Sequence, residues 1–398
     1  MALKLQYRNV AVLFGSQAMF MTNQIVLITL SGLVGQMLAP VKSLATLPVS
    51  TVVIATALTT IPASMLMKRI GRRAGFMIGA LIGLMGVALS IYAIWIETFW
   101  LFAAATFIMG INGGFSQYYR FAAADVASPE FRSRAISFVI SGGIAAAVLG
   151  PLLVRQTNDL MDIPFIGSYI SLFGVGLVTL LLLSFLSIPK PTDDEINSSG
   201  RPLPQITRAP AFIVAAMAGT IGYAVMSLIM TATPIAMHSH GFDVSDSSFV
   251  IQWHVMAMFV PSLFTGNLIQ RFGVLKIIFS GLVLLFGCVG LAVNGVDILH
   301  FSAALFVLGL GWNFTFVGAS TLLTETYQPS ERAKVQATND FLVFGTVATA
   351  SLSSGVLLTV YDWNTVNFFA LPFLAITMAV VLWYAVMRRR QEAVSQQA

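Results

Sequence analysis

The sequence predicts an all-α membrane protein with twelve transmembrane helices in two pseudo-symmetric six-helix bundles. The 398 residues are 57% hydrophobic and only 9% charged, and the mean hydropathy is +0.85. Soluble domains carry about 25% charged residues, so this composition excludes a large soluble catalytic domain. An apolar run of about 20 residues crosses a bilayer, and a chain of this length has room for roughly a dozen. The single cysteine, Cys288, excludes an intramolecular disulfide and a thiolate metal cage.

Charges and Gly/Pro clusters delimit the apolar runs, because backbone groups in hydrocarbon must be paired within their own helix. The first run is too long for a signal peptide and lacks a small-residue cleavage site, so we interpret it as a membrane helix. Residues 188–209 form the only long polar stretch, which we interpret as a flexible cytoplasmic linker between bundles at 1–187 and 210–398. The expected spans are 10–35, 45–66, 75–96, 98–122, 135–155, 166–187, 210–237, 247–269, 274–295, 299–322, 335–360 and 365–387.

Lys and Arg residues gather in alternate loops. If the N-terminus is cytoplasmic, eighteen of them lie on the cytoplasmic side and only Lys42 and Arg155 lie outside. The positive-inside rule therefore predicts that both termini are cytoplasmic.

The two halves repeat each other. Asp125, Pro129, Arg132 and Arg134 recur 200 residues later as Glu325, Pro329, Arg332 and Lys334, which is typical of a transporter built from repeats. These clusters predict an inner gate of ion pairs; the alternative is ordinary charged loops, since a surface pair contributes about 0–1 kcal/mol. The expected gate residues are Arg69, Arg72, Asp125, Arg132, Arg134, Arg271, Glu325, Arg332 and Lys334.

Polar side chains inside hydrocarbon are costly and mark candidate sites. Asp340 lies inside the eleventh span, where a buried carboxylate can exchange a proton with one side at a time; the alternative is a carboxylate stabilised by the helix N-terminus and a nearby Lys or Arg. Arg120 belongs either to the cytoplasmic charges or to the site. The expected polar cavity residues are Asn23, Gln24, Gln117, Arg120 and Asn313.

Met and His form two spaced pairs, Met226 with Met230 in the seventh span and His254 with Met258 in the eighth. Residues four apart share a helix face, and antiparallel helices would bring both pairs to similar depths. Thioethers and imidazole suit Cu(I), so this pattern predicts a metal site; the alternative is that Met fills gaps in helix packing. At the outer end, Met237, His238 and His240 are either metal-collecting residues or solvated loop residues.

The sequence contains no P-loop, no HExxH motif and no nucleophile with a matched base. It therefore predicts no enzyme, no cofactor and no nucleic-acid partner, and transport driven by an ion gradient or by the cargo's own gradient. We expect a monomer whose partners are the lipid bilayer and either a copper ion or a small-molecule substrate.

The sequence resembles the major facilitator superfamily over essentially its whole length. The loop motif of that family, G-x-x-x-D-R-x-G-R-R, is matched by Arg69, Gly71, Arg72 and Arg73, with Ser64 and Lys68 in place of the glycine and the aspartate. A second copy keeps Gly266, Arg271 and Gly273. The resemblance implies two bundles that rock about a central site, which opens alternately to each side.

The Met and His pairs also resemble the MxxxM and HxxxM pairs of the CcoA-type copper importers within that superfamily. This resemblance implies copper import across the bacterial inner membrane for cytochrome oxidase assembly, with Met226, Met230, His254 and Met258 as the copper-binding residues. The alternative cargo is an organic solute such as riboflavin or an amphipathic compound. Its cavity would be lined by Asn23, Gln24, Gln117, Tyr118, Tyr223, Trp312 and Asn313. A non-transporting sensor is disfavoured, because a fixed receptor needs no repeated halves.

Overall fold

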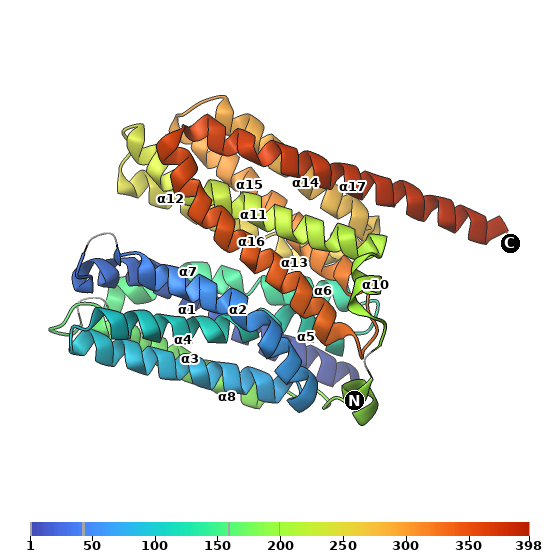
Figure 1. The fold of residues 1–398 in the computed structure, drawn as a ribbon, viewed down its shortest axis with the longest axis horizontal. Coiled ribbons are helices and arrows are strands. Elements are labelled where there is room, and N and C mark those ends of the chain that lie inside the picture. Colours follow the sequence, from blue (N-terminus) through green and yellow to red (C-terminus); the bar gives the residue numbers. More distant parts are fainter. Residues whose placement is uncertain (1, 42–43, 158–159, 199, 398) are drawn as a thin grey trace. The chain divides into compact units, whose positions relative to one another are not determined.

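The computed structural model describes residues 2–41, 44–157, 160–198 and 200–397. Lys42, one of the two positive charges expected outside, lies beyond these ranges. The described chain is helical almost throughout (Figure 1). Its helices are α1 (Ala2–Leu38), α2 (Leu47–Ile70), α3 (Arg72–Trp95), α4 (Phe99–Ser116), α5 (Tyr119–Val126), α6 (Arg132–Ile140), α7 (Gly143–Thr157), α8 (Ile166–Ser184), α9 (Asp193–Asn197), α10 (Leu203–Thr207), α11 (Pro210–Ser239), α12 (Val244–Phe259), α13 (Ser262–Phe272), α14 (Val274–Val293), α15 (Ile298–Leu323), α16 (Arg332–Val360) and α17 (Trp363–Gln397).

Eleven helical stretches in the described chain are long and apolar enough to cross a membrane. Among them, α4 with α5 forms one span and α6 with α7 forms another. The pair α12 and α13, bent by 41° between Phe259 and Ser262, makes a twelfth when it is counted as one span. The predicted all-α membrane fold with twelve spans is confirmed.

Contacts divide the chain into two compact units. Unit 1 comprises Met1–Pro129, Phe138–Ser199 and Arg332–Phe341, and unit 2 comprises Glu130–Ser137, Gly200–Glu331 and Leu342–Ala398. Two helices, α6 and α16, therefore belong in part to each unit. The expected bundle boundaries did not anticipate this exchange of helix ends, and their exact positions stay a prediction.

The core of unit 1 is a continuous apolar cluster between α1, α2, α3, α4 and α8. It contains Leu27 and Leu30 from α1, Val87 from α3 and Phe102 from α4, all of which are buried. The Phe102 ring meets the edge of Tyr169 with ring centroids 5.7 Å apart. Tyr169 is buried with its hydroxyl 3.3 Å from the Ser31 hydroxyl, so its polar end has a partner inside the bundle.

Helix ends follow the local sequence. Asp243 and Asp246 form a capping box at the start of α12, and Asp297 accepts a hydrogen bond from the His300 amide at the start of α15. Gly71 and Gly273 separate α2 from α3 and α13 from α14 with φ of +90° and +91°. A side chain at either position would be strained, which accounts for glycine at both corresponding loops.

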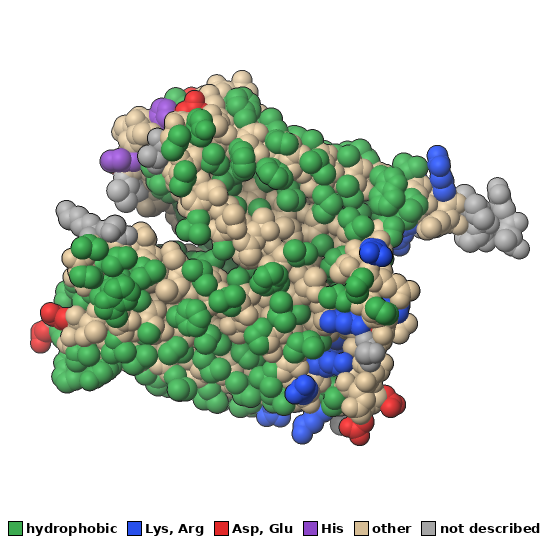
Figure 2. All heavy atoms as spheres, viewed as in Figure 1, with side chains coloured by type: hydrophobic (Ala, Val, Ile, Leu, Met, Phe, Trp, Pro, Cys, Tyr) green, Lys and Arg blue, Asp and Glu red, His purple; other side chains and the backbone are tan. Residues whose placement is uncertain are grey.

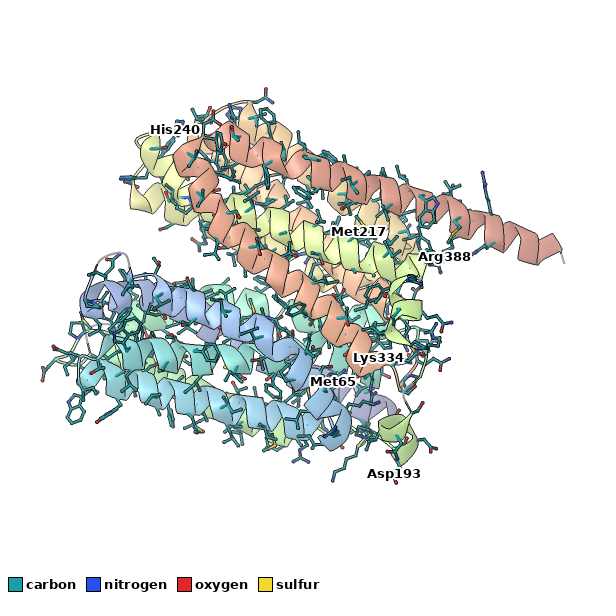
Figure 3. All side chains as sticks on the ribbon, in the orientation of Figure 1. Met65, Asp193, Met217, His240, Lys334 and Arg388 are labelled. Atoms are coloured by element: carbon teal, nitrogen blue, oxygen red, sulfur yellow. The ribbon has the colours of Figure 1, made fainter. Side chains whose placement is uncertain are left out.

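The side chains are distributed as a lipid environment requires. Apolar side chains cover the flanks of the helices in each unit, and Lys and Arg gather toward one end of them (Figure 2). In unit 2, His240 lies near one end of the helices and Arg388 toward the other, with Met217 between them (Figure 3). This separation of charge fits the alternate placement of basic loops in the sequence.

The polar stretch at 188–209, whose role as a linker stays a prediction, contains two short helices. It contains α9, which starts with a capping box of Thr192 and Glu195, and α10. Lys68 donates to the Ser198 carbonyl at 3.0 Å. In unit 2, Arg201 donates to Glu331 Oε2 at 2.7 Å, and this carboxylate is fully buried. The hydrogen bonds at Ser198 and Arg201, near the middle of this segment, were not predicted from the sequence.

Candidate functional site

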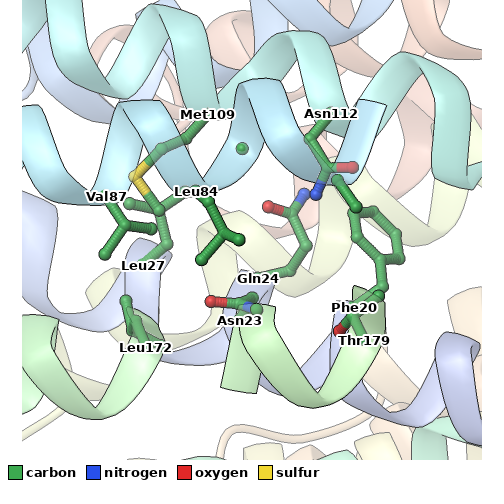
Figure 4. A pocket seen from close by; sticks show the side chains of 13 residues that line it. Phe20, Asn23, Gln24, Leu27, Leu84, Val87, Met109, Asn112, Leu172 and Thr179 are labelled. Atoms are coloured by element: carbon green, nitrogen blue, oxygen red, sulfur yellow. The ribbon is translucent and has the colours of Figure 1, made fainter. Parts of the chain in front are cut away.

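A small polar cavity lies inside unit 1 between α1, α3, α4 and α8. Its volume is about 20 Å³, which is enough for one water molecule. Asn23 and Gln24 of α1 and Asn112 of α4 bring three amide groups to it (Figure 4). Asn23 Oδ1 is buried and has no hydrogen-bond partner among the described residues. Two of the expected cavity residues, Asn23 and Gln24, therefore lie together at a hydrophilic spot in an apolar bundle.

Arg120 and Asp340 form a buried ion pair in unit 1. Arg120 Nη2 donates to Asp340 Oδ1 at 2.6 Å, and the side chains are 4% and 0% exposed. Arg120 Nη1 also donates to the Gln117 carbonyl oxygen at 2.7 Å. Asn339 Nδ2 donates to the same Asp340 oxygen at 2.9 Å. The structure thus joins Gln117 and Arg120, which were expected to line the cavity, with Asp340, which was expected to exchange a proton.

A second charged cluster surrounds Arg72 in unit 1. Arg72 Nη2 lies 3.1 Å from Asp125 Oδ2 and donates to Gln336 Oε1 at 2.5 Å. Arg332 is 3.8 Å from the same Asp125 oxygen and 3.5 Å from Glu195. Three expected gate residues, Arg72, Asp125 and Arg332, therefore lie together. Gln336 was missed, although it follows Arg332 by one helical turn and shares its face.

Two other expected gate residues, Glu325 and Arg271, contact other partners. Glu325 pairs with Arg388 at 3.4 Å, and both side chains are partly exposed. Arg271 lies over the Phe272 ring at 5.2 Å. Arg69 and Arg134 are exposed. The gate role of the full set stays a prediction, because an exposed pair stabilises weakly.

The ends of α6 and α16 are held by matching contacts. In unit 1, Ser64 of α2 donates to the Ala333 carbonyl of α16 at 2.9 Å. In unit 2, Ser133 of α6 donates to the Gly266 carbonyl of α13 at 3.1 Å. A Cβ on Gly266 would lie 2.7 Å from Arg134 Cα, so this helix approach requires glycine. Ser64 and Gly266 occupy the same position in the two copies of the loop motif, and each contacts the start of a helix.

An aromatic cluster lies in unit 2. Trp312 stacks on Phe316 of the same helix with ring centroids 5.1 Å apart, and Tyr223 of α11 meets both edge-on at 5.2 Å. Phe259 of α12 is 5.7 Å from Trp312, and Phe344 of α16 is 5.8 Å from Tyr223. Trp312 is 2% exposed, and its indole N–H has no hydrogen-bond partner among the described residues. A buried indole normally finds an acceptor, so this donor is available to a ligand.

Asn313, expected to line the cavity, is fully occupied in holding the bend between α12 and α13. Its Nδ2 donates to the Met258 carbonyl at 2.6 Å and to the Ser262 hydroxyl at 2.5 Å. Thr265 donates to its Oδ1 at 2.6 Å. Pro261 lies in this bend, where the helix is interrupted, and the side-chain amide of Asn313 from α15 gives the Met258 carbonyl a hydrogen-bond donor. The contacts describe a packing role for Asn313.

The Met and His pairs face the interior of unit 2. Met226, His254 and Met258 are buried, and Met230 is partly buried. His254 Nδ1 donates to the Leu305 carbonyl at 2.7 Å, which fixes the ring against α15. Gly309 of α15 lies so close to the backbone of α12 that its Cβ would be 3.0 Å from the Met258 nitrogen. These contacts make α12 part of a tight helix interface.

The expected metal-collecting residues do not share one environment. Met237 is buried in unit 2, whereas His238 and His240 are exposed. His240 Nδ1 donates to the Ala236 carbonyl at 2.7 Å, so this nitrogen is engaged within its own helix end. Among the described residues, no three His, Cys, Asp or Glu side chains are grouped to hold a metal ion.

Proteins of similar sequence are transporters. The chain is 43% identical to the riboflavin transporter RfnT of Brucella anthropi over 378 residues, which cover 94% of this chain and 95% of that protein. It is 28% identical to the MFS-type transporter YddS of Bacillus subtilis over 383 residues, covering 92% and 87% of the two chains.

Solved structures share the fold. The human organic anion transporter TETRAN matches with a TM-score of 0.77 at 14% identity, covering 94% of this chain and 99% of that chain. The E. coli fucose:proton symporter FucP matches with a TM-score of 0.76 at 15% identity, covering 94% and 98%. At these identities the match establishes the fold alone.

The prediction of copper import is wrong. The relative at 43% identity is named for riboflavin, and nothing supports copper as cargo or a kinship with the CcoA-type importers. The Met and His pairs misled because four-residue spacing marks any helix face, including one that packs against a neighbouring helix. The ligand roles of Met226, Met230, His254 and Met258 stay predictions, and copper import no longer supports them.

One family assignment accounts for the twelve spans, the paired glycine turns and the repeated loop motif. Residues 12–250 and 215–398 both match the Major Facilitator Superfamily. This chain belongs to the Major Facilitator Superfamily of membrane transporters.

Proposed function

We propose that this chain carries riboflavin across the bacterial cytoplasmic membrane as a secondary transporter that works by alternating access. The observation that carries the proposal is the 43% identity to a riboflavin transporter over nearly the full length of both chains. An organic solute such as riboflavin is also the alternative cargo that the sequence analysis left open beside copper.

The types of side chain inside the described units support a flavin, such as riboflavin, as the cargo. Its flat aromatic ring system can stack on aromatic side chains, and its carbonyl and imide groups need hydrogen-bond partners. Unit 2 supplies the aromatic cluster around Trp312, whose N–H has no partner among the described residues. We propose Trp312 as a stacking and hydrogen-bonding residue for the flavin ring.

We further propose that both termini are cytoplasmic and that ion pairs at this end act as an inner gate. The distribution of Lys and Arg supports the orientation. The cluster of Arg72, Asp125 and Arg332 supports the gate, because several buried or half-buried charges act together there.

Uptake of labelled riboflavin by cells that lack any other riboflavin transporter tests the cargo. Cells with this chain should accumulate riboflavin above cells with an empty vector, and labelled copper should not differ between them. Trp312→Ala should lower riboflavin uptake about tenfold or more at equal protein abundance, because a buried aromatic contact to a ligand contributes about 2 kcal/mol or more.

Trp253→Ala is the matched control, because Trp253 is 49% exposed on the outside of α12. It should keep wild-type uptake. The cargo assignment is overturned if the wild type is present and folded in the membrane but takes up no riboflavin. If the two tryptophan variants change riboflavin uptake equally, Trp312 is not part of the binding site, but riboflavin is still the cargo.

A further inference from the structure

An open pocket lies at the basic end of unit 2, where α13 ends and α14 begins, beside the last turns of the α17 span. Its volume is about 390 Å³, which is typical of a ligand pocket. Three cations line it, Lys276 from α14 and Arg388 and Arg389 from α17. Phe272 and Leu275 contribute an apolar wall. The pocket therefore offers both positive charge and apolar surface to a ligand.

The charges in this pocket do not cancel. Glu325 is the one carboxylate among its described lining residues, and it lies 3.4 Å from Arg388. Lys276 and Arg389 are exposed, and neither side chain has a hydrogen bond or ion pair among the described residues. Three cations against one carboxylate leave two positive charges, so the pocket attracts an anion.

Exposed apolar side chains continue from these cations into the bilayer. On α14, Phe279 and Val283 follow Lys276 by three and seven residues, so they share its helix face, and both are exposed. On α17, Leu382 precedes Arg389 by seven residues and is also exposed. The two helices pack against each other. Seven residues of helix cover roughly 10 Å, so this apolar surface extends from the charges to the depth of acyl chains.

We propose that the pocket binds the phosphate of an anionic phospholipid from the leaflet at the basic end of the helices. Lys276 and Arg389 hold the phosphate, and the acyl chains lie along α14 and α17. With both termini in the cytoplasm, as proposed above, this is the cytoplasmic leaflet. Basic pockets between membrane helices on that side suit anionic headgroups.

Other occupants fit the pocket less well. A zwitterionic headgroup brings an ammonium group that needs an acidic partner, and Glu325 is already paired with Arg388. A free phosphate ion would use the cations but would leave the apolar wall and the exposed side chains below it uncovered. An anionic phospholipid matches both parts of the surface.

Native mass spectrometry of the delipidated, detergent-purified protein measures the binding. Dioleoylphosphatidylglycerol is titrated as the anionic lipid and dioleoylphosphatidylcholine as the zwitterionic one. A third series adds millimolar inorganic phosphate to the protein with bound phosphatidylglycerol. The wild type should bind phosphatidylglycerol about tenfold more tightly than phosphatidylcholine, because two positive charges meet the headgroup. Inorganic phosphate should not displace the lipid.

The double variant Lys276→Gln with Arg389→Gln should bind phosphatidylglycerol about thirtyfold more weakly, since each basic residue contributes a factor of about five. Its affinity for phosphatidylcholine and its unfolding temperature should stay at wild-type values, because both side chains are exposed. Lys4→Gln with Arg8→Gln is the matched control, since it removes the same charge from exposed positions of α1. It should bind phosphatidylglycerol as the wild type does.

Four results would overturn the proposal. Equal affinity of the wild type for the two lipids would show that headgroup charge is not recognised. Displacement of phosphatidylglycerol by inorganic phosphate would make the pocket a site for free phosphate. Equal losses in the two double variants would show a general effect of net charge. A folded Lys276 and Arg389 variant with wild-type affinity would place the lipid elsewhere. Riboflavin is absent from every measurement, so none of these results changes the proposed cargo.

Discussion

Glu331 is a buried carboxylate that precedes α16, and Arg201 from the polar stretch between the sequence halves is its partner. Arg201 donates to both carboxylate oxygens, at 2.8 and 2.7 Å, and the Gln328 amide donates to Oε2 at 3.0 Å. Hydrogen bonds from Arg201 are the main reason why the pKa of Glu331 falls from 4.5 to about 2. The sequence shows an acid beside the repeated Arg332, but it does not show that a residue 130 positions away reaches it.

This pair predicts a pH dependence of stability. A carboxylate whose pKa is lower in the folded state stabilises the fold above its ordinary pKa, and this contribution is lost as the pH falls through the folded value. Glu331→Gln should therefore lower the unfolding temperature at neutral pH. The gap between wild type and variant should close as the pH falls from 4.5 to about 2. Thermal unfolding of the detergent-purified wild type and variant at a series of pH values measures this difference in unfolding temperature.

Glu97→Gln is the control, since Glu97 is exposed and should show no such gap. A gap that is unchanged at the lowest pH would mean that the amide variant harms the fold for a reason unrelated to charge.

At the scale of elements, the first turns of α6 and α16 are held against neighbouring helices by close contacts. Ser64 contacts the start of α16, and Gly266 contacts the start of α6. The loop motif predicted that these positions matter, and the structure adds the partner and the reason. Where the first copy has a serine, its hydroxyl spans the gap to the Ala333 carbonyl. Where the second copy has glycine, backbone meets backbone, and no side chain fits.

A methyl group at Gly266 should therefore be poorly tolerated. The added Cβ would lie 2.7 Å from both Arg134 Cα and the Ser133 carbonyl oxygen, and backbone atoms cannot yield as a flexible side chain can. We expect Gly266→Ala to cost about 1–3 kcal/mol of stability, as overpacking does. Riboflavin uptake should fall as well. Thermal unfolding and uptake measured on the same preparation check both effects.

Gly290→Ala is the matched control, because an added Cβ at this helical glycine of α14 meets nothing within 4 Å. It should leave stability unchanged or raise it slightly, since alanine favours helix more than glycine does. If Gly266→Ala behaves like Gly290→Ala, the close contact between α13 and α6 is not a constraint on this protein.

At the scale of the whole molecule, the two copies of the repeat share the backbone conformation of their glycine turns but differ in their ion pairs. Gly71 and Gly273 adopt the same positive φ in the two copies. The residue after Gly71 is Arg72, which binds Asp125, whereas the residue after Gly273 is Val274. Glu325, the repeat partner of Asp125, turns instead to Arg388. Asp125 and Glu325 therefore have different partners, so a fixed offset in sequence did not guarantee equal contacts.

The orientation in the membrane belongs to the same scale. With both termini cytoplasmic, Asn197→Cys should react with a membrane-impermeant maleimide only after the cells are permeabilised. Ser239→Cys should react in intact cells. Both positions are exposed, and both variants are made in a Cys288→Ser background, because Cys288 is the only natural cysteine. The reverse labelling pattern would place the termini outside and exclude the proposed orientation.

The sequence by itself determined the class of the molecule. Apolar runs of bilayer length required helices, because a helix pairs its backbone groups within one continuous segment inside lipid. Basic loops at alternate ends predicted the topology. It also singled out Asp340 as an ionisable residue inside hydrocarbon. These features depend on local composition, which needs no knowledge of neighbours in space.

Only the tertiary structure decided which polar groups meet. Arg120 and Asp340 are 220 residues apart in sequence and 2.6 Å apart in the fold, and Gln336 joins Arg72 across 264 residues. It also showed that Asn313 serves a helix bend and that His254 is bound to a carbonyl oxygen of α15. Such pairings depend on how helices pack, because spacing within one helix tells which residues share a face but not what that face meets.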